Sequence, residues 1–259
     1  MEPHYVICRV AVAPLRTEPS DKAEISSQLL FGDHAEVIAE TDRWWKLRNA
    51  FDGYEGWVDF KQFTDISAEQ FEANNSCEYV VPARALNVVT DNEGVPYYLS
   101  PGSNLPFYKD GFCWLGKERY ELQFEPRRTV GKDLSNIIPD ARFFRNVSYL
   151  WGGRNFFGMD CSGFTQTVFK LNGFNLARDA WQQAEQGTTV DFLQSVQSGD
   201  VAFFDNPEGR ITHVGIMLNP QEIIHASGKV RIDQIDNQGI YNAELGRYTH
   251  KLRIIKRYS

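Results

Sequence analysis

The sequence lacks three features that would point to common functional classes. None of its four cysteines, Cys8, Cys77, Cys113 and Cys161, form a C-x-x-C pair, so neither a zinc ribbon nor a dithiol redox site is indicated. A basic excess is missing, because the formal net charge is −7, whereas a nucleic-acid-binding surface needs a basic stripe that displaces counterions from phosphate. The N-terminal stretch contains Arg9, so it resembles neither a secretory signal nor a membrane span. We therefore expect no nucleic-acid partner and no membrane span.

Free thiols fit a reducing compartment, and the sequence predicts a cytoplasmic protein unless a signal has been removed, in which case it would be periplasmic or exported. Cys8, Cys77 and Cys113 lie in the strand-like contexts VICRVAV, NNSCEYVV and GFCWLG, which indicates packing roles. The chain of 259 residues predicts two or three domains. Aromatic residues make up 14% of it and stand in short runs beside Gly, Thr and Val, which favours an α+β fold over a helical bundle.

Residues 5–64 alternate short apolar strands with turn signals, in the pattern of a small β-barrel. The elements PLRTEPS, LLFGD, WWKLR and DGYEGWV resemble a bacterial SH3-like (SH3b) domain, which we place at residues 1–65. Residues 66–128 are also β-rich, and EYVVPARALNVVTD is faintly similar to HYVICRVAVAPLRTE. We interpret them as a second, divergent SH3-like barrel, with an elaborated linker domain as the alternative.

Helical periodicity first appears after residue 128, in the region that we assign to a third domain, residues 129–259. Phe164, Val168 and Leu171 recur at helical spacing, and Gly173 follows where a C-terminal glycine would stand. The segments DVAFFD, HVGIML and EIIHAS then read as successive strands. This order predicts an α+β unit with one helix that opens at Cys161.

Cys161 is a candidate nucleophile because of its place at the start of that helix. With Asp160 as N-cap, Cys161 falls in the first turn, where unpaired backbone N–H groups and the helix dipole stabilise negative charge. The pattern predicts a lowered thiol pKa, which turns a cysteine into a nucleophile at neutral pH. The same N–H groups could receive an oxyanion. A buried, inert cysteine is the alternative.

Two histidines could complete such a site. Strand alternation places His213, Gly215 and Met217 on one face. If strands 213–218 and 222–227 pair about a turn at 219–221, His225 comes near the beginning of the first strand, so that one histidine acts as base and the other holds its tautomer. Cysteine and histidine are also zinc ligands, but eleven residues separate the histidines (214–224) and no second cysteine is near, so no metal is expected.

The stretch SYLWGGRNFFGMDCSGFTQTVF, followed by Gly199–Asp200, THVGI and IIHASG, strongly resembles the NlpC/P60 cysteine peptidases. The resemblance implies a papain-like α+β fold and a Cys-His-His triad without a cofactor. By that match Cys161 is the nucleophile, His213 the general base and His225 the residue that orients it. Tyr149 matches the position whose hydroxyl helps the oxyanion hole, although packing beside Trp151 would equally explain a tyrosine there.

SH3-like barrels before such a domain resemble the γ-D-glutamyl-L-diamino-acid endopeptidases of the dipeptidyl-peptidase VI type. The resemblance implies cleavage after D-Glu in cell-wall peptides (murein tri- or tetrapeptides) that carry a free N-terminal L-Ala, in peptidoglycan recycling. An ammonium group in a closed pocket needs acidic or carbonyl acceptors. Asp179 matches the family position that supplies one, Tyr54 matches the SH3-domain tyrosine that closes the pocket, and Glu18 is a looser match. Asp160 and Ser162, which flank the nucleophile, are also expected at the substrate.

The three residues matched to the amine pocket each have an ordinary alternative: Asp179 could pair with Arg178, Tyr54 could belong to the barrel core, and Glu18 could be a solvated loop residue. Ala180 departs from the family pattern, since many relatives carry serine there. Two other functions stay open, a cell-wall-peptide binding protein without activity, and an amidase or acyltransferase of the same fold. We expect a monomer, and the sequence does not choose between L-Lys and diaminopimelate after D-Glu.

Overall fold

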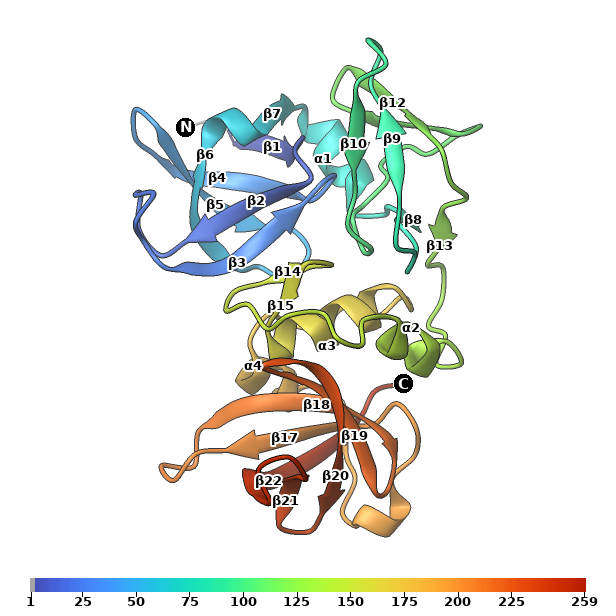
Figure 1. Cartoon of the computed structure of the whole chain (residues 1–259). Helices are drawn as coiled ribbons and strands as arrows, with labels where there is room; N and C mark the ends of the chain where they lie inside the picture. Colours follow the sequence, from blue (N-terminus) through green and yellow to red (C-terminus); the bar gives the residue numbers. More distant parts are fainter. Residues whose placement is uncertain (1–2) are drawn as a thin grey trace. The chain divides into compact units, whose positions relative to one another are not determined.

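The computed structural model describes residues 3–259, which divide into two compact units (Figure 1). The first unit runs to Val130 and also includes Trp151–Phe156. The second comprises Gly131–Leu150 and Phe157–Ser259. The strands and helices are those of an α+β protein, as predicted.

The first unit begins with the small antiparallel barrel expected from the turn signals. Its seven strands follow one another in the order β3-β2-β6-β5-β4-β1-β7. Alternate residues of these strands fill its interior, among them Val6, Leu15, Leu47 and Val58, each at most 1% exposed. The strands are β1 (His4–Cys8), β2 (Val12–Arg16), β3 (Ile25–Leu30), β4 (His34–Glu40), β5 (Trp44–Asn49), β6 (Glu55–Asp59) and β7 (Phe63–Ile66), with a 3₁₀ turn at Phe60–Gln62.

The region after the barrel contains a four-stranded antiparallel sheet, and its interpretation as a second, divergent SH3-like barrel stays a prediction. The described strands are ordered β10-β9-β12-β11, and β13 pairs with β8 in a separate ladder. The elements are α1 (Ala68–Asn74), β8 (Tyr79–Val80), β9 (Val88–Thr90), β10 (Pro96–Tyr98), β11 (Phe112–Leu115), β12 (Glu118–Leu122) and β13 (Arg127–Arg128).

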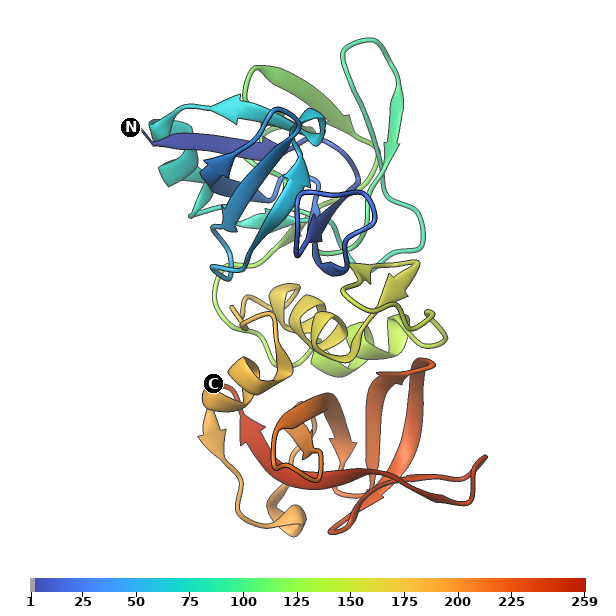
Figure 2. The same ribbon diagram turned by 90° about the vertical axis from the view of Figure 1, so that its left-hand side faces the viewer.

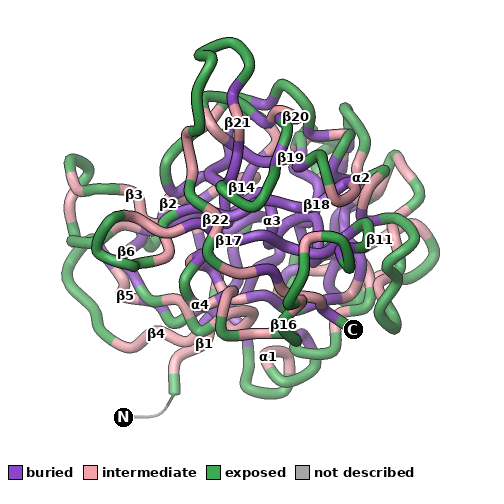
Figure 3. The backbone as a smooth tube through the Cα atoms, turned by 90° about the horizontal axis from the view of Figure 1, so that it is seen from below, coloured by how far each residue is buried: buried purple, intermediate pink, exposed green. Residues whose placement is uncertain are grey.

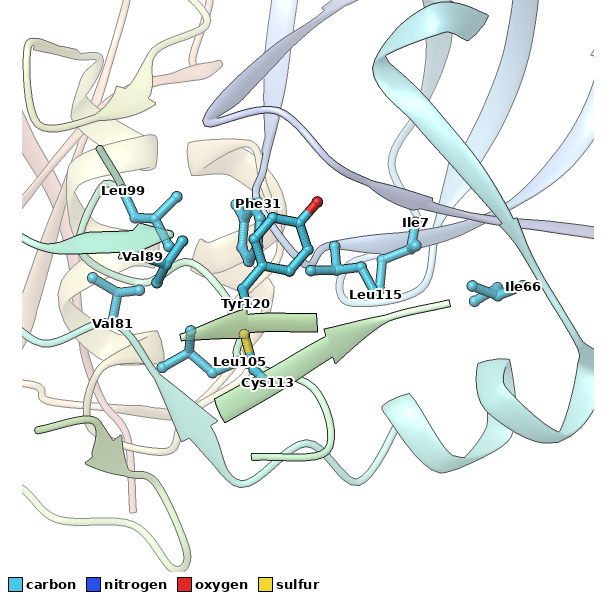
Figure 4. Close-up of a cluster of buried hydrophobic side chains, with 10 residues drawn as sticks. All are labelled: Ile7, Phe31, Ile66, Val81, Val89, Leu99, Leu105, Cys113, Leu115 and Tyr120. Atoms are coloured by element: carbon cyan, nitrogen blue, oxygen red, sulfur yellow. The ribbon is translucent and has the colours of Figure 1, made fainter. Parts of the chain in front are cut away.

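This open sheet shares its hydrophobic core with the barrel, as Figure 4 shows. Ile7, Phe31 and Ile66 of the barrel segment pack with residues of the following region. Those partners are Val81, Val89, Leu99, Leu105, Cys113, Leu115 and Tyr120. The sheet after the barrel thus buries its apolar face against the barrel.

The segment Trp151–Phe156, which contains β14 (Arg154–Asn155), is folded into the first unit by buried hydrogen bonds. The backbone N–H of Arg154 donates to Oε1 of Gln28 at 2.8 Å, and its Nη1 donates to the Gln28 carbonyl at 2.9 Å. Gly152 has φ +73°, and a Cβ there would lie 2.3 Å from the Ile25 carbonyl oxygen. Only glycine therefore fits this approach.

The second unit is built around a closed antiparallel barrel of six strands. The sheet runs β16-β22-β17-β18-β19-β20-β21, and β22 also pairs with β21, which closes it. In Figures 1 and 2 these strands lie together in orange and red, with helix α3 along one side of them. The elements are α2 (Ile137–Phe143), β15 (Gly158–Met159), α3 (Cys161–Lys170), α4 (Ala180–Glu185), β16 (Thr188–Thr189), a 3₁₀ turn (Leu193–Ser195), β17 (Val201–Asp205), β18 (Ile211–Asn219), β19 (Glu222–Ser227), β20 (Lys229–Asp236), β21 (Gly239–Asn242) and β22 (Arg247–Arg257).

Helix α3 is the most deeply buried helix segment of the second unit. All ten of its residues are buried, and Figure 3 shows it in purple. The predicted apolar stripe of Phe164, Val168 and Leu171 is present, each at most 1% exposed. Gly173 follows with φ +79°, and its N–H donates to the Lys170 carbonyl, as expected for the end of a helix.

The four cysteines carry no disulfide, and Cys8 and Cys113 are fully buried, in line with their predicted packing roles. Among residues 3–259, no helix combines the length and apolarity that crossing a membrane requires.

Candidate active site

Cys161 opens α3, as the sequence predicted, and Asp160 caps the helix. Oδ1 of Asp160 accepts the backbone N–H of Gly163 at 2.7 Å, which satisfies one of the helix's unpaired donors. The cysteine is therefore held in the first turn of α3, where the residue is 7% exposed.

A buried arginine, which the sequence analysis mentioned only as a partner for Asp179, holds this helix start. Arg178 is 1% exposed and donates from Nη1 and Nη2 to the two carboxylate oxygens of Asp160, at 3.0 and 2.5 Å. Its Nη1 also donates to the Ser162 hydroxyl at 2.8 Å. The side chains of Asp160 and Ser162 are thus engaged in a charge-assisted network, and their expected contacts with substrate stay a prediction.

The structure corrects the predicted charge state of the thiol. Burial, followed by the negative charge of Asp160, raises the pKa of Cys161 to about 12. Hydrogen bonds from the backbone N–H groups of Val214 and Ser162, and the charge of Arg178, act in the opposite direction without outweighing burial. The prediction of a lowered pKa is wrong for the resting protein, so a base must remove the proton when the nucleophile is used.

The two histidines meet as the hairpin register predicted. Gly215 of β18 stands opposite His225 of β19, and Nε2 of His213 lies 2.8 Å from Nδ1 of His225. The pairing of Asn219 with Glu222 is out of step with the rest of the hairpin by one residue. This irregularity puts His225 on the same face of the hairpin as His213. Because the Val214 N–H bonds the Cys161 sulfur, the nucleophile lies beside the start of the strand that carries His213.

Asp233 of β20, which the sequence analysis did not identify, determines how the two imidazoles are protonated. Its Oδ2 lies 3.0 Å from Nε2 of His225. Burial acts to raise the pKa of Asp233, but hydrogen bonds from His225 and Arg231 lower it, so the carboxylate can only accept. His225 then carries its proton on Nε2 and accepts at Nδ1 from Nε2–H of His213. The lone pair of His213 is left on Nδ1, where it can take a proton.

Arg231 holds this carboxylate from outside. Its Nη2 donates to Oδ1 of Asp233 at 2.9 Å, and its Nε lies 2.8 Å from Oδ2. Glu244 in turn accepts from Nη1 of Arg231 at 3.0 Å. The arrangement is a chain of charges and hydrogen bonds that ends on the pair His213 and His225.

A third histidine, His250 of β22, also reaches the pair. Its ring stacks on His213, with centroids 4.0 Å apart and planes 24° from parallel. Burial, followed by the neighbouring His225, lowers the pKa of His250 to about 4, and burial likewise lowers the pKa values of His213 and His225. All three imidazoles are therefore neutral at pH 7, and the resting pair is a thiol beside a neutral base.

Tyr149 lies close enough to Cys161 for the charge of that thiol group to affect the pKa of its phenol. Burial, followed by the charges of Cys161 and Asp160, raises the pKa of the Tyr149 phenol to about 12. Its backbone N–H donates at 3.0 Å to the carbonyl of Gly228, which lies between β19 and β20. This bond ties the segment that carries Tyr149 to that turn. A protonated phenol near the sulfur suits the predicted role as an oxyanion donor.

The three residues expected to recognise an amine are distributed over both units. Asp179 is half-buried at the start of α4, directly after Arg178, and its backbone N–H donates to Oε1 of Gln182 at 3.1 Å. Tyr54 belongs to the first unit, where it packs against the barrel core, and Glu18 lies exposed in the loop after β2. The role of each in binding stays a prediction.

Asp233, Arg231 and His250 left different traces in the sequence. Arg231 and Asp233 are alternate residues of KVRIDQID, so one strand face carries opposite charges directly after the strand of His225. That pattern could have revealed them. Nothing in YTHKLRII marks His250, which reaches the site because β22 pairs with β17, the neighbour of β18.

Two segments of the chain match known family models. Residues 146–248 match the NlpC/P60 family, and residues 15–63 match the bacterial dipeptidyl-peptidase SH3 domain.

The chain is also similar to proteins that span both segments. A gamma-D-glutamyl-L-lysine dipeptidyl-peptidase of Bacillus subtilis (strain 168) is 29% identical over 216 residues, which cover 78% of this chain and 72% of that protein. Dipeptidyl-peptidase 6 of Lysinibacillus sphaericus is 25% identical over 260 residues, 88% of this chain and 90% of that protein. The crystal structure of an NlpC/P60 family protein from Bacillus cereus has the same fold, with a TM-score of 0.82 at 20% identity over 98% of this chain and 99% of that one.

The cysteine at the helix start, the paired histidines and these matches agree. The chain therefore contains an NlpC/P60 domain at residues 146–248, together with an SH3 domain of the bacterial dipeptidyl-peptidase type at residues 15–63.

Proposed function

We propose that this peptidase hydrolyses the bond between D-Glu and the following L-diamino acid, L-Lys or diaminopimelate, in cell-wall peptides with a free N-terminal L-Ala. We further propose that it serves peptidoglycan recycling in the cytoplasm. The observation that carries the proposal is the presence of both parts in one chain, a peptidase domain and an SH3 domain of the dipeptidyl-peptidase type. The relatives from Bacillus subtilis and Lysinibacillus sphaericus, which are named as dipeptidyl-peptidases, match across 78% and 88% of this chain.

The proposed reaction begins with proton transfer from the Cys161 thiol to Nδ1 of His213. The resulting thiolate attacks the γ-carbonyl carbon of D-Glu and forms a tetrahedral intermediate. Its oxyanion accepts hydrogen bonds from backbone N–H groups at the start of α3 and from the Tyr149 hydroxyl. His213, now an imidazolium, is stabilised through His225 by the negative charge of Asp233.

The intermediate then expels the amine of the diamino acid, which takes its proton from His213. A thioester between Cys161 and L-Ala-γ-D-Glu remains. His213 removes a proton from an incoming water, whose oxygen attacks the thioester carbonyl and frees the dipeptide and the thiol. Protons and electrons balance without a cofactor.

Recognition of the free L-Ala amine is proposed to depend on Asp179, with Tyr54 and Glu18 contributing from the SH3 unit. Asp179 follows Arg178, which in turn contacts the residue before the nucleophile. A carboxylate so near the helix start can offset the desolvation of an ammonium group. A substrate with an acylated amine would lose this interaction, so peptides in intact glycan should be poor substrates.

The test is mass-spectrometric analysis of products from L-Ala-γ-D-Glu-diaminopimelate, its L-Lys counterpart and N-acetylated copies, with Cys161→Ala as control. We expect release of L-Ala-γ-D-Glu from the free-amine peptides only, and none with the control. Equal cleavage of acetylated peptides would remove the amine-binding role of Asp179, Tyr54 and Glu18. No cleavage of any of them would reject the proposed substrate and favour an amidase or acyltransferase.

A further inference from the structure

Three imidazoles converge at one end of the barrel in the second unit. His213, His225 and His250 each offer one ring nitrogen, and these nitrogens all lie within 4.8 Å of one another. They come from β18, β19 and β22, and β17 lies between β18 and β22 in the sheet. Two of the rings belong to the proposed catalytic pair, whereas His250 has no part in the reaction described above. It also lies beyond the residues that match the family model, 146–248.

Two of the three rings are oriented by a further polar group on the nitrogen that faces away from the cluster. His225 donates from Nε2 to Asp233, which leaves the lone pair of Nδ1 on the cluster side. The Thr249 hydroxyl donates to the Ile240 carbonyl and lies 2.9 Å from Nδ1 of His250, so its oxygen accepts that N–H and Nε2 of His250 keeps a lone pair. Metal-ligating histidines are oriented in this way, by a carboxylate or another acceptor on the second nitrogen.

We propose that His213, His225 and His250 form a binding site for one Zn²⁺ ion, and that its occupation inhibits the peptidase. The ligand atoms would be Nε2 of His213, Nδ1 of His225 and Nε2 of His250, with water in the fourth position. Three neutral imidazoles and one water are a set that zinc accepts in tetrahedral geometry. His213 and His225 are 6% and 1% exposed, while His250 is partly exposed and gives the ion a way in.

The geometry requires two local adjustments. Nε2 of His213 and Nδ1 of His225 are 2.8 Å apart, as a hydrogen bond requires. Two nitrogens on one tetrahedral zinc stand about 3.4 Å apart, given Zn–N distances of about 2.0–2.1 Å. The ion therefore replaces the shared proton and moves these two rings apart. The lone pair of a ring nitrogen lies in the plane of its ring, so His250, whose ring is stacked on that of His213, must also turn before both lone pairs point at one ion.

Zinc binding inhibits by changing the tautomer of His213. When Nε2 gives its lone pair to zinc, the proton that it carried moves to Nδ1, so no net proton is released. Nδ1 then has no lone pair with which to accept the Cys161 proton, and the thiol, whose pKa is raised by burial, stays protonated. The inhibition rests on the proposed catalytic role of His213, whereas the binding does not.

The test measures Zn²⁺ binding by isothermal titration calorimetry on the full chain with Cys161→Ala, which removes the thiol as a competing ligand. His250→Asn is made in the same background, and His4→Asn, a partly exposed histidine of the first unit, is the matched control. We expect one ion per chain, weakened at least about tenfold by His250→Asn and unchanged by His4→Asn. Equal affinity in all three chains, or no stoichiometric binding, would overturn the proposal.

A second measurement follows inhibition of the active chain. Zn²⁺ should inhibit reversibly, with recovery on addition of EDTA, and His250→Asn should raise the half-inhibitory concentration by at least about tenfold relative to its own uninhibited rate. Inhibition that does not depend on His250 would assign the ion to Cys161 and His213 and reject the three-histidine site. If His250→Asn does not fold by circular dichroism, Thr249→Val replaces it, because loss of the orienting hydroxyl should weaken binding in the same direction.

Discussion

Two arginine–aspartate pairs contact the groups of the proposed chemistry, and they differ in what they hold in place. Arg178 and Asp160, with side chains 1% and 8% exposed, fix the start of the helix that carries the nucleophile. Arg231 and Asp233, with side chains 16% and 4% exposed, hold the histidine pair instead. The first pair contacts the end of a helix and the second contacts a proton-carrying group.

Because of this difference, we expect the first pair to matter mainly for stability and the second mainly for the proposed reaction. Asp160 is an N-cap as well as an ion-pair partner, so its network contributes to the stability of α3. Asp233 caps no helix and acts through His225 on the tautomer of His213. Disruption of the first pair should therefore appear mainly in unfolding measurements, and disruption of the second mainly in kcat.

The largest effect is expected from Asp233→Ala. His225 would lose the acceptor that fixes its proton on Nε2, so the lone pair of His213 would no longer be held on Nδ1. We expect kcat to fall roughly 10²- to 10⁴-fold. The smaller loss is typical when a hydrogen-bond partner that orients a functional side chain is removed, and the larger when a catalytic histidine takes the wrong tautomer. KM should change little, and both are measured on the dipeptide-releasing reaction.

Asp236→Ala is the matched control for that variant, because Asp236 lies on the same strand but is exposed and bonded to Tyr248. Its kcat should stay within a few-fold of the parent. A similar loss in both variants would mean that β20 matters for folding rather than for the histidine pair.

Arg178→Met is expected to have the next largest effect, on stability. It leaves the Asp160 carboxylate buried without its cation, and removal of one partner from a buried pair costs about 3–5 kcal/mol. Urea unfolding followed by circular dichroism measures the change. Arg128→Met, which breaks an exposed pair with Glu78 in the first unit, should have a much smaller effect because water screens that pair. Equal costs for the two variants would contradict the structural role of Arg178.

The parts of the site that could be predicted from the sequence depend on local rules. An N-cap followed by helical spacing locates Cys161, and the short turn of a hairpin brings His213 to His225. His250 escaped prediction because it joins the others through the pairing of β22 with β17, a contact between distant segments that no local pattern reveals. The same holds for Arg178, whose burial depends on packing rather than on its neighbours in the chain.

The predicted pKa shift of Cys161 went wrong because burial cannot be read from a local pattern. The spacing of apolar residues predicted helix α3 but not that all ten of its residues are buried, and this burial reverses the expected shift of the Cys161 pKa. Packing in the first unit is equally hidden in the sequence, since the sheet after the barrel buries its apolar face against the barrel (Figure 4). In both cases the missing information is how much surface other elements cover.

Gly215→Ala tests how tightly the histidine pair is held from the strand side. A Cβ at Gly215 would lie 2.7 Å from Cβ of His225, so His225 must move. We expect a loss of stability of about 1–3 kcal/mol from overpacking, together with a lower kcat. Gly209→Ala, which meets no atom within 4 Å but has φ +78°, should destabilise through its backbone while kcat is kept. Unchanged kcat for Gly215→Ala would show that the pair tolerates displacement.

The smallest effect is expected at the outer end of the second network, from Glu244→Gln. The side chain of Glu244 is 72% exposed, and it joins the network through its contact with Nη1 of Arg231. Because water and salt screen an exposed pair, its removal should cost no more than about 1 kcal/mol, and Asp233 keeps both contacts with Arg231. The rate should therefore fall less than about tenfold, a change that 1 M salt would reproduce in the parent. A loss as large as that of Asp233→Ala would mean that Arg231 depends on Glu244 for its position, and that the network reaches the protein surface as one unit.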